Sequence, residues 1–319
     1  IKKDFIHKGM GLFLHAYTLL YTKTKNEEYL NKATFFYRWL IHNSSPDYEE
    51  KCWGLNYDYA SSDGFFKKFS PSLVVTAFIF NAIFEYYQQI KNNAIKEVLL
   101  SAGNFVLNHI PVTQFSHSTC LSYTPYKKDL CFNANALGSQ MMAKLFYLTG
   151  DITYKNLATQ SMNYIIEKQH ADGRWNYSVH NGKERAQIDF HQGFILDALK
   201  DYCTFVQPAD NKFITSYVKG LEFYYEKQFF PNGRSLWRLP KKYPVDIHNQ
   251  SQGIITFSRA HDVDNKYPDF AAKIAAWTIT HMFDKKGFFY YRVYPCYKNT
   301  INYMRWSQAW MLLALAHLK

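Results

Sequence analysis

Apolar residues recur at intervals of three and four along most of the chain, and each apolar run is followed by a more charged one. Residues 151–168 have apolar side chains at helical spacing, and the run before them, 141–149, stops at Gly150. Residues 12–22 and 27–42 form another such pair. The pattern therefore predicts helical hairpins, each with one apolar helix and one helix that carries more charge.

The hairpins repeat along the chain. A polar cluster opens an apolar helix at six places: residues 8–11, 69–72, 133–138, 187–193, 245–253 and 303–310. Three of the clusters contain Gln followed by a small residue, at intervals of 60 and 56 residues (252 − 192 = 60 and 308 − 252 = 56): Gln192-Gly193, Gln252-Gly253 and Gln308-Ala309. Between the hairpins, turns followed by aromatic residues recur at 52–57, 172–177, 232–237 and 286–291.

A fixed long period is the signature of a repeat architecture, in which neighbouring hairpins cover each other's apolar faces. The sequence therefore predicts an all-α protein, an (α/α)6 six-hairpin toroid with short β-like segments in the loops. The apolar helices should form the inner ring and the charged helices, such as 27–42 and 265–281, the outer ring. Residues 1–319 should be a single domain, because the repeat is even and no Pro- or Ser-rich linker interrupts it.

The chain has no run of 18 apolar residues, so no transmembrane helix is expected. Its first residue is isoleucine, and we therefore expect an original N-terminus to be missing, together with any leader that it carried. The compartment, cytoplasm or periplasm, stays undecided on this sequence. The oligomeric state is equally undecided.

Composition adds two features. Aromatic residues make up 18% of the chain, and those that follow the turns lie in loops, where flat rings suit the C–H faces of sugars. The formal net charge of +11 favours an anionic partner. Nucleic acid is not expected, because the chain lacks a Lys/Arg-rich helix and any recognised nucleic-acid motif. The five cysteines show no metal-ligand spacing, and no dinucleotide or phosphate fingerprint occurs, so neither a metal nor a cofactor is expected.

If the inner helices begin at one end, their polar starts meet in one cavity. We expect five residues to be catalytic: Asp189, His191, Asp246, His248 and Arg305. Asp189 and Asp246 are a carboxylate pair suited to acid–base work on a glycosidic bond. His191 and His248 are alternative proton carriers, and Arg305 could hold a uronate carboxylate. A lyase or epimerase would instead abstract the proton next to that carboxylate and stabilise the enolate.

A second group of residues is expected to bind substrate. Its members lie on the cavity wall, in the rim loops or at the helix starts: Asn133, Asn135, Trp53, Tyr57, Trp175, Tyr177, Gln192, Gln252, Trp306 and Gln308. The alternative interpretation is structural, because Asp and Asn at helix starts cap backbone N–H groups, and buried histidines and arginines often join helices. The two Asp-x-His pairs are a weak signal for a metal.

The segments 133–137, 168–177, 188–194, 246–248 and 304–311, in this order, resemble a bacterial family encoded in exopolysaccharide, capsule and O-antigen loci. The resemblance covers roughly residues 50–319. It implies a polysaccharide context, and an architecture similar to the six-hairpin toroids of glycoside hydrolases, polysaccharide lyases and sugar epimerases. It implies no particular reaction. The chain departs from the family pattern at Gln192, where threonine is expected.

We therefore expect a carbohydrate-active protein that acts on a bacterial, acidic polysaccharide in a central cleft. Glycoside hydrolase, lyase and epimerase chemistry all fit the residues. The alternative is a non-catalytic glycan-binding or assembly protein of polysaccharide biosynthesis that uses the same cleft. A terpenoid cyclase is excluded, because the Asp-rich motifs that it needs are absent.

Overall fold

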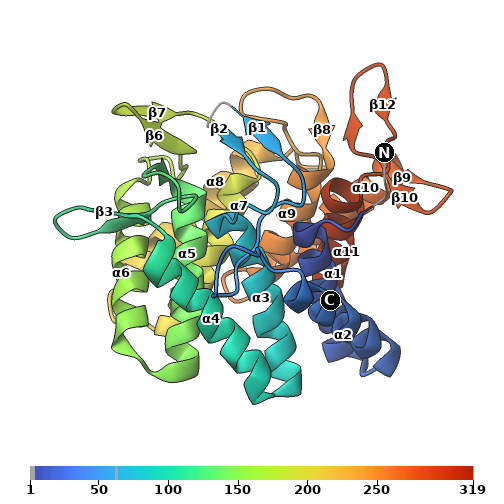
Figure 1. Cartoon of the computed structure of the whole chain (residues 1–319). Helices are drawn as coiled ribbons and strands as arrows, with labels where there is room; N and C mark the ends of the chain where they lie inside the picture. Colours follow the sequence, from blue (N-terminus) through green and yellow to red (C-terminus); the bar gives the residue numbers. More distant parts are fainter. Residues whose placement is uncertain (1–3, 62–63, 319) are drawn as a thin grey trace.

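Six inner helices form a ring, and outer helices pack against them. Figure 1 shows the helices from the side. The computed structural model describes residues 4–61 and 64–318. The inner helices are α1 (His7–Thr24), α3 (Leu73–Ile90), α5 (Phe132–Thr149), α7 (His191–Val206), α9 (Ile247–Arg259) and α11 (Trp310–His317). The outer helices are α2 (Glu27–His42), α4 (Asn93–His109), α6 (Ile152–Glu167), α8 (Lys212–Gln228) and α10 (Lys266–Met282). A π-helix, η1 (Met304–Ala309), leads directly into α11.

The ring closes because each inner helix packs on the next and α11 returns to α1. Lys23 Nζ at the end of α1 also donates a hydrogen bond to the carbonyl of Leu318. Buried side chains from Met10 to Ala316 form a continuous hydrophobic cluster. The predicted (α/α)6 toroid is confirmed, with one difference. Within the described residues five of the six inner helices have an outer partner, since only Leu318 follows α11.

Helix ends follow the local signals of the sequence. Asn26, Asn92 and Asp151 cap outer helices by accepting a hydrogen bond from a backbone N–H two residues on, at 2.8–2.9 Å. Ser72 caps the inner helix α3 through the N–H of Val75. Helix α5 stops at Gly150, whose φ of +74° is left-handed and costs glycine little. These caps explain why boundaries expected from the sequence, such as 27–42, match the structure.

The loops carry short antiparallel strands, several of which lie at the top of Figure 1, while others project from its two sides. Three pairs stand alone: β1 (Tyr59–Ser61) with β2 (Gly64–Phe66), β3 (Val112–Gln114) with β4 (Thr119–Leu121), and β9 (Phe283–Asp284) with β10 (Phe288–Phe289). Two sheets have three strands: β5 (Leu130–Cys131), β6 (Ser178–His180) and β7 (Lys183–Arg185) in one, and β12 (Lys298–Asn299), β11 (Arg292–Val293) and β8 (Val245–Asp246) in the other. The β-like segments expected in the loops are thus present.

One polar side chain of each of five inner-helix starts binds the loop that precedes it. Gln192 Oε1 accepts a hydrogen bond from the Trp175 N–H at 2.9 Å, and its Nε2 donates to the Trp175 carbonyl at 2.6 Å. Gln308 forms the same pair of bonds with Phe289, at 3.0 and 2.9 Å. The corresponding bonds elsewhere are made by Thr76 to Trp53, Asn135 to Leu121, and Gln250 to Ser235 and Gly233. We call these five residues the loop clamps.

The loop clamps correct the register of the repeat. Gln192, Gln250 and Gln308 are evenly spaced at 58 residues (250 − 192 = 58 and 308 − 250 = 58), so Gln250, and not Gln252, is the equivalent of Gln192. Gln252 instead points to another contact and donates to Asp197 Oδ2 at 2.7 Å. The glycine after Gln192 has a packing role, because a Cβ on Gly193 would lie 2.5 Å from Gln252 Cγ.

A second polar layer crosses the ring near the middle of the inner helices. Lys144 Nζ of α5 lies 2.9 Å from Asp201 Oδ2 of α7, and Arg259 of α9 binds the other oxygen of Asp201. Arg259 also lies 3.4 Å from Asp197, whose pKa burial raises to about 6. Burial opposes the charge of Asp201, yet Arg259 and Lys144 hold the pKa of that carboxyl well below its usual range. Buried amides complete the network: Asn81, Gln140 and Gln252.

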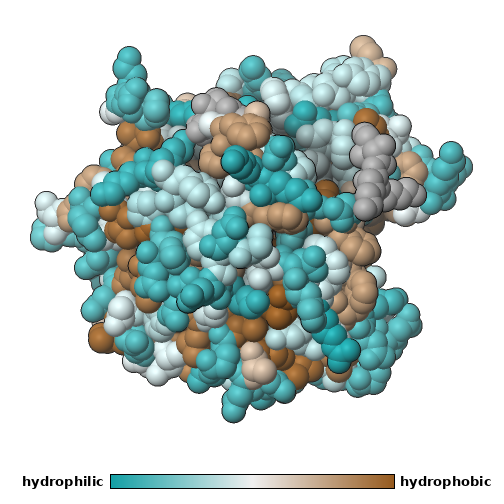
Figure 2. Space-filling model, in the orientation of Figure 1, coloured by the Kyte–Doolittle hydropathy of each residue, from teal (hydrophilic) through white to brown (hydrophobic). Residues whose placement is uncertain are grey.

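The outside of the molecule is mostly hydrophilic, with apolar side chains scattered among polar ones on the face seen in Figure 2. Within the described parts of the chain, none of the helices is long and apolar enough to cross a membrane.

Candidate functional site

Four inner-helix starts bring basic and aromatic side chains together at the axis of the ring. His248 of α9 is the central residue. Burial lowers its pKa well below the ordinary value, and three basic neighbours oppose a further positive charge on it: Lys8, His191 and Arg305. These neighbours come from α1, α7 and η1. The geometry therefore brings His191, His248 and Arg305, named from the sequence, into one cluster.

Asp189 and His191 form a carboxylate–imidazole pair at the start of α7. His191 Nδ1 lies 2.5 Å from Asp189 Oδ1, and Gln187 donates to the other carboxylate oxygen at 2.9 Å. Burial opposes the charge of Asp189, but His191 and the hydrogen bonds outweigh it and lower the pKa of the carboxyl. A charged Asp189 keeps the proton of a neutral His191 on Nδ1, which leaves Nε2 as an acceptor. The His191 side chain is 14% exposed, and so more accessible than the buried Asp189 at 2%.

His248 is enclosed by rings rather than by polar groups. Its imidazole stacks on Phe190 at 3.8 Å and tilts over Trp310 at 4.4 Å. The residue is 1% exposed, and neither ring nitrogen has a hydrogen-bond partner within the described residues. Buried polar atoms are almost always paired, so two unpaired nitrogens on one side chain mark a place where a ligand or water completes the site.

Lys8 and Arg305 are basic residues without a carboxylate partner in the described part of the chain. Lys8 Nζ lies 4.0 Å from the centre of the Phe78 ring, and the rings of Phe194 and Trp310 lie at 5.5 and 5.4 Å. Burial, and then the charge of Arg305, lower the pKa of Lys8 well below its ordinary value. Across residues 4–61 and 64–318, neither Lys8 Nζ nor the Arg305 guanidinium has an ion pair, and Arg305 Nε is buried without a partner. Basic side chains without an acidic partner and aromatic rings thus lie together at the axis; we call the rings of Phe78, Phe194 and Trp310 the aromatic floor.

The π-helix η1 sets the position of Arg305. Its guanidinium lies over the Trp306 ring at 4.2 Å, and Tyr57 from a rim loop lies on the same guanidinium at 5.9 Å. π-Helical turns are rare and are frequent at functional sites, because the wider turn redirects side chains. Tyr57 is 37% exposed, and Tyr177 lies with its ring 4.8 Å from His191. Tyr57, Tyr177 and Trp306 therefore border the cluster.

Asp246 has the contacts of a helix cap. Its Oδ1 accepts the backbone N–H of His248 at 3.0 Å, and its Oδ2 accepts Arg292 Nε at 2.7 Å. Burial raises the pKa of Asp246 despite Arg292, and the charge of Asp189 raises it further. The two carboxylates are therefore close enough to interact. Both oxygens of Asp246 are occupied, however, which suits a residue that positions His248 better than one that transfers a proton itself.

Two tryptophans expected at the rim are core residues, which corrects the sequence interpretation. Trp53 and Trp175 are both 0% exposed. Each indole N–H donates to a carbonyl of an outer helix, Trp53 to Leu40 at 2.9 Å and Trp175 to Ile165 at 2.8 Å. They seal each hairpin against its loop, because a large buried ring stabilises more than the same ring in water.

Four polar residues expected to bind substrate also have internal partners. Asn135, Gln192 and Gln308 are loop clamps, and Gln252 belongs to the second polar layer. Since their amides already have hydrogen-bond partners, they shape the site without needing to touch a ligand. Asn133 is buried at the start of α5, where its Oδ1 lies 3.0 Å from Cys131 Sγ.

The structure adds residues that the sequence interpretation missed. Lys8 lies in the first of the six polar helix starts, and its place in the repeat was the signal that could have revealed it. Arg238 approaches Asp189 Oδ2 at 3.5 Å from a loop, and Arg292 binds Asp246 from the short strand β11; neither belongs to the repeated polar helix starts. The aromatic floor also uses Phe78, Phe194 and Trp310. Among the described residues, no group of three His, Cys, Asp or Glu side chains could hold a metal ion.

The architecture matches solved structures of sugar-processing proteins. Cellobiose 2-epimerase from Bacillus thermoamylovorans is similar over 98% of this chain and 87% of that chain, with 15% identity and a TM-score of 0.75. A GH76 α-mannanase from Bacteroides thetaiotaomicron matches over 98% and 86%, with 15% identity and a TM-score of 0.73. A D-mannose isomerase matches over 98% and 87%, with 12% identity and a TM-score of 0.70. At such identities the likeness shows a shared fold, the (α/α)6 toroid. No protein-family model and no curated protein matches the chain.

Proposed function

We propose that the protein is a carbohydrate-active enzyme that moves a proton at a carbon next to the carboxylate of an acidic saccharide, as an epimerase or a lyase does. The observation that carries the proposal is the 2.5 Å contact between Asp189 and His191, which orients a histidine beside the unpaired His248. Two histidines at one site can act as proton acceptor and proton donor. Burial keeps His248 neutral in the free protein, and the negative charge of the bound carboxylate and enolate favours its protonated form during the reaction.

In this reaction His191 Nε2 takes the proton from the carbon next to the carboxylate. The electron pair of the broken C–H bond moves onto the carboxylate oxygens and makes an enolate with one further negative charge. The Arg305 guanidinium, which has no carboxylate partner among the described residues, offsets that charge in a setting that excludes much of the water. The negative charge of the ligand also favours the protonated form of Lys8, which then adds a second positive charge. Preorganised cations of this kind stabilise the transition state more than the ground state.

The fate of the enolate separates the two reaction types. If His248 returns a proton to the opposite face of the carbon, the product is the epimer. If the bond between the next carbon and its glycosidic oxygen breaks instead, the electron pair of the enolate forms a carbon–carbon double bond and leaves an unsaturated uronate. The oxygen departs with the electron pair of the broken bond and takes the proton that His191 holds, so the leaving sugar ends in a hydroxyl. The half-buried ring of Trp306 and the exposed ring of Tyr57 offer flat faces on which the C–H side of a sugar can lie.

A glycoside hydrolase is the second candidate. The raised pKa of Asp246 is what a general acid requires, and Asp189 lies close enough to affect it. Against this, Asp246 is bound by His248 N and Arg292, and Asp189 by His191 and Gln187. The resemblance to proteins of exopolysaccharide loci supports a polysaccharide-derived substrate in either case.

The test is one incubation with three readouts. The protein is incubated in deuterium oxide with hexuronate oligosaccharides, including oligogalacturonides and glucuronate-containing oligosaccharides, and with neutral cello-oligosaccharides. Deuterium at C5 of a uronate indicates an epimerase, and the ultraviolet absorbance of an unsaturated uronate indicates a lyase. New reducing ends without either would replace the proposal with the hydrolase. Binding without any reaction would favour the non-catalytic glycan-binding or assembly protein.

A further inference from the structure

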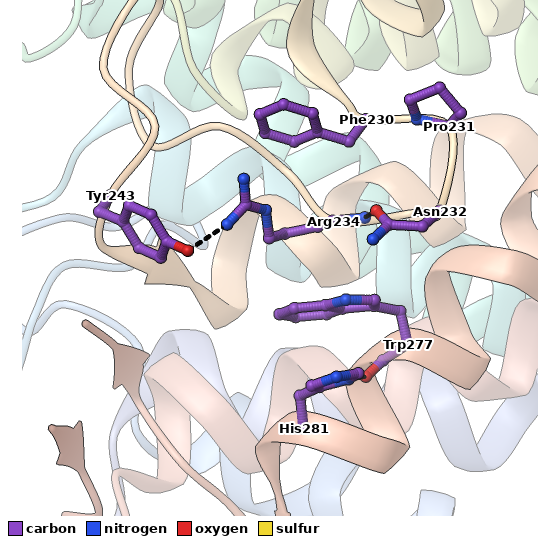
Figure 3. Close-up of a pocket in the computed structure, with 7 residues that line it drawn as sticks. All are labelled: Phe230, Pro231, Asn232, Arg234, Tyr243, Trp277 and His281. Carbon is purple, nitrogen blue, oxygen red and sulfur yellow. Dashed lines mark hydrogen bonds between the residues drawn. The ribbon is translucent and has the colours of Figure 1, made fainter. Parts of the chain in front are cut away.

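We call the group of Lys8, His191, His248 and Arg305, together with the neighbouring Asp189, the axial cluster. A hollow elsewhere on the molecule lies between the loop that follows α8 and helix α10, and none of these five residues lines it (Figure 3). Its volume is about 530 Å³. The residues that line it are Phe230, Pro231, Asn232, Arg234, Tyr243, Trp277 and His281. We call it the outer groove. Four of the seven have aromatic rings, and Arg234 supplies a positive charge.

Arg234 is held between rings at the centre of the outer groove. Its guanidinium carbon lies 4.2 Å from the centre of the Phe230 ring and 4.7 Å from that of Tyr243, and its Nη1 donates to the Tyr243 hydroxyl. No carboxylate of the described residues forms an ion pair with it. Figure 3 shows the Arg234 side chain extending toward Tyr243, with Phe230 above it and Trp277 below it. The remaining N–H groups of the fork can therefore bind a carboxylate of a ligand.

Trp277 and His281 lie one helical turn apart on α10, and the His281 ring covers one face of the indole. Their rings stack at 4.3 Å with an interplanar angle of 10°, and His281 Nδ1 is fixed by the Trp277 carbonyl at 2.8 Å. Trp277 is half-buried, so it has a rigid position and an accessible surface. A flat indole beside hydrogen-bonding groups is the arrangement that accommodates a sugar ring.

The loop of the outer groove is rigid before any ligand binds. Gly233 has a φ of +89°, and a Cβ there would lie 2.8 Å from the backbone of Ile274, so the loop rests directly on α10. The loop clamp Gln250 binds Ser235 N–H at 2.7 Å and the Gly233 carbonyl at 3.2 Å. A preformed site binds more tightly because less chain entropy is lost.

The same loop continues from the outer groove to the axial cluster. Beyond Arg234 it carries Trp237, whose ring has Arg238 at 4.9 Å, Lys241 at 5.7 Å and Arg292 at 5.9 Å. Arg238 in turn approaches Asp189 of the axial cluster at 3.5 Å. Basic and aromatic side chains thus alternate between the two places, which suits a long anionic sugar chain more than a small free anion.

We propose that the outer groove is a second saccharide-binding site, which holds an acidic sugar residue of the chain whose other part reaches the axis. The sugar ring lies on Trp277, and its carboxylate pairs with Arg234. The identity of the ligand class rests on the proposed function, whereas the existence of the groove site does not.

The test measures affinity rather than turnover. Binding of a hexagalacturonate and of neutral cellohexaose to the full chain is measured by calorimetry, and oxidative footprinting reports whether Trp277 and Tyr243 become protected. We expect Trp277→Ala to weaken hexagalacturonate binding at least about tenfold. Arg234→Gln should weaken hexagalacturonate binding as much while leaving that of cellohexaose nearly unchanged. Both variants are first checked for an unchanged unfolding midpoint.

Arg38→Gln is the matched control. Arg38 lines another surface hollow that also contains a tryptophan and a histidine, Trp39 and His42, but no ring contact holds its guanidinium among the described residues. The Arg38→Gln variant loses the same charge as Arg234→Gln and should bind hexagalacturonate as tightly as the parent does. Equal affinities in the parent and both groove variants, or no protection of Trp277, would overturn the proposal. His191→Gln separates the two proposals. Since His191 does not line the outer groove, this variant should still show protection of Trp277 by hexagalacturonate, whether or not the parent turns over any saccharide.

Discussion

Two lysines inside the ring differ only in their partners, and that difference sets opposite expectations for stability. Lys144 is paired with Asp201 at 2.9 Å, while Lys8 has three rings around it and no acid. Lys144→Met should lower the free energy of unfolding by about 3–5 kcal/mol, since it breaks a buried ion pair. Lys8→Met should leave it unchanged or raise it by up to about 1 kcal/mol, because a desolvated, unpaired charge is removed.

Urea denaturation of the two variants side by side checks this. Lys8→Met should at the same time lose affinity for the acidic oligosaccharide, which is the behaviour of a functional group that costs stability. Equal destabilisation by the two substitutions would mean that Lys8 is a structural residue.

The histidine next to Asp189 is the residue on which the proposed chemistry depends most. His191→Gln keeps a hydrogen-bonding side chain but removes the proton acceptor, so kcat/KM should fall by roughly 10²–10⁴-fold. His170→Gln is the control, because His170 also contacts a carboxylate, Glu184 at 3.0 Å, but on the surface. Turnover assays on both variants decide it, and a comparable loss in both would remove His191 from the mechanism.

At the scale of elements, the loop clamps join each inner helix to the loop before it. Gln250 is fully buried and bonded to Ser235 N–H, the Gly233 carbonyl and Thr278 Oγ1. Gln250→Leu keeps the volume but leaves these groups unpaired, so the free energy of unfolding should fall by about 3 kcal/mol. Gln160→Leu, at an exposed position of α6, should change it by less than about 0.5 kcal/mol. Thermal and urea unfolding test the pair, and similar losses would show that leucine itself, not the lost clamp, is responsible.

The whole molecule contains several histidines that cannot easily take up a proton. Burial lowers the pKa of His7, His15, His248 and His317, that of His15 to about 3. Below about pH 6.5 the unfolded chain binds protons at these sites and the folded chain does not, so stability is full above that pH and falls as the pH drops. Asp197, with its pKa raised to about 6, acts in the opposite direction.

The difference between parent and variant isolates one of these groups. In His248→Gln the loss of stability below pH 6.5 should be smaller than in the parent, by a slope that rises toward about 1.4 kcal/mol per pH unit as the pH falls. Urea unfolding at a series of pH values from 7.5 to 5.5 measures the two slopes. Parallel slopes would show that His248 takes up a proton in the folded state as readily as in the unfolded chain.

The sequence alone determined the period, the helices and the end of the ring at which the polar groups gather. Local signals were sufficient for this, because caps such as Asn26 and stops such as Gly150 act within a few residues, and apolar spacing follows from helix geometry. They also indicated His191, His248 and Arg305 as residues that would converge, since equivalent helix starts lie at equivalent heights around a ring.

Only the tertiary structure decided which faces of those helices meet the axis. Gln250 and Gln252 lie two positions apart, and so about 200° around the helix, which means that the packing of α9 against its neighbours determines which of them reaches the loop. The same holds for Trp53 and Trp175, whose burial depends on hairpins far away in the sequence. Lys8 joins the cluster because α11 returns to α1, so its lack of an acidic partner is a property of the closed ring and not of any segment.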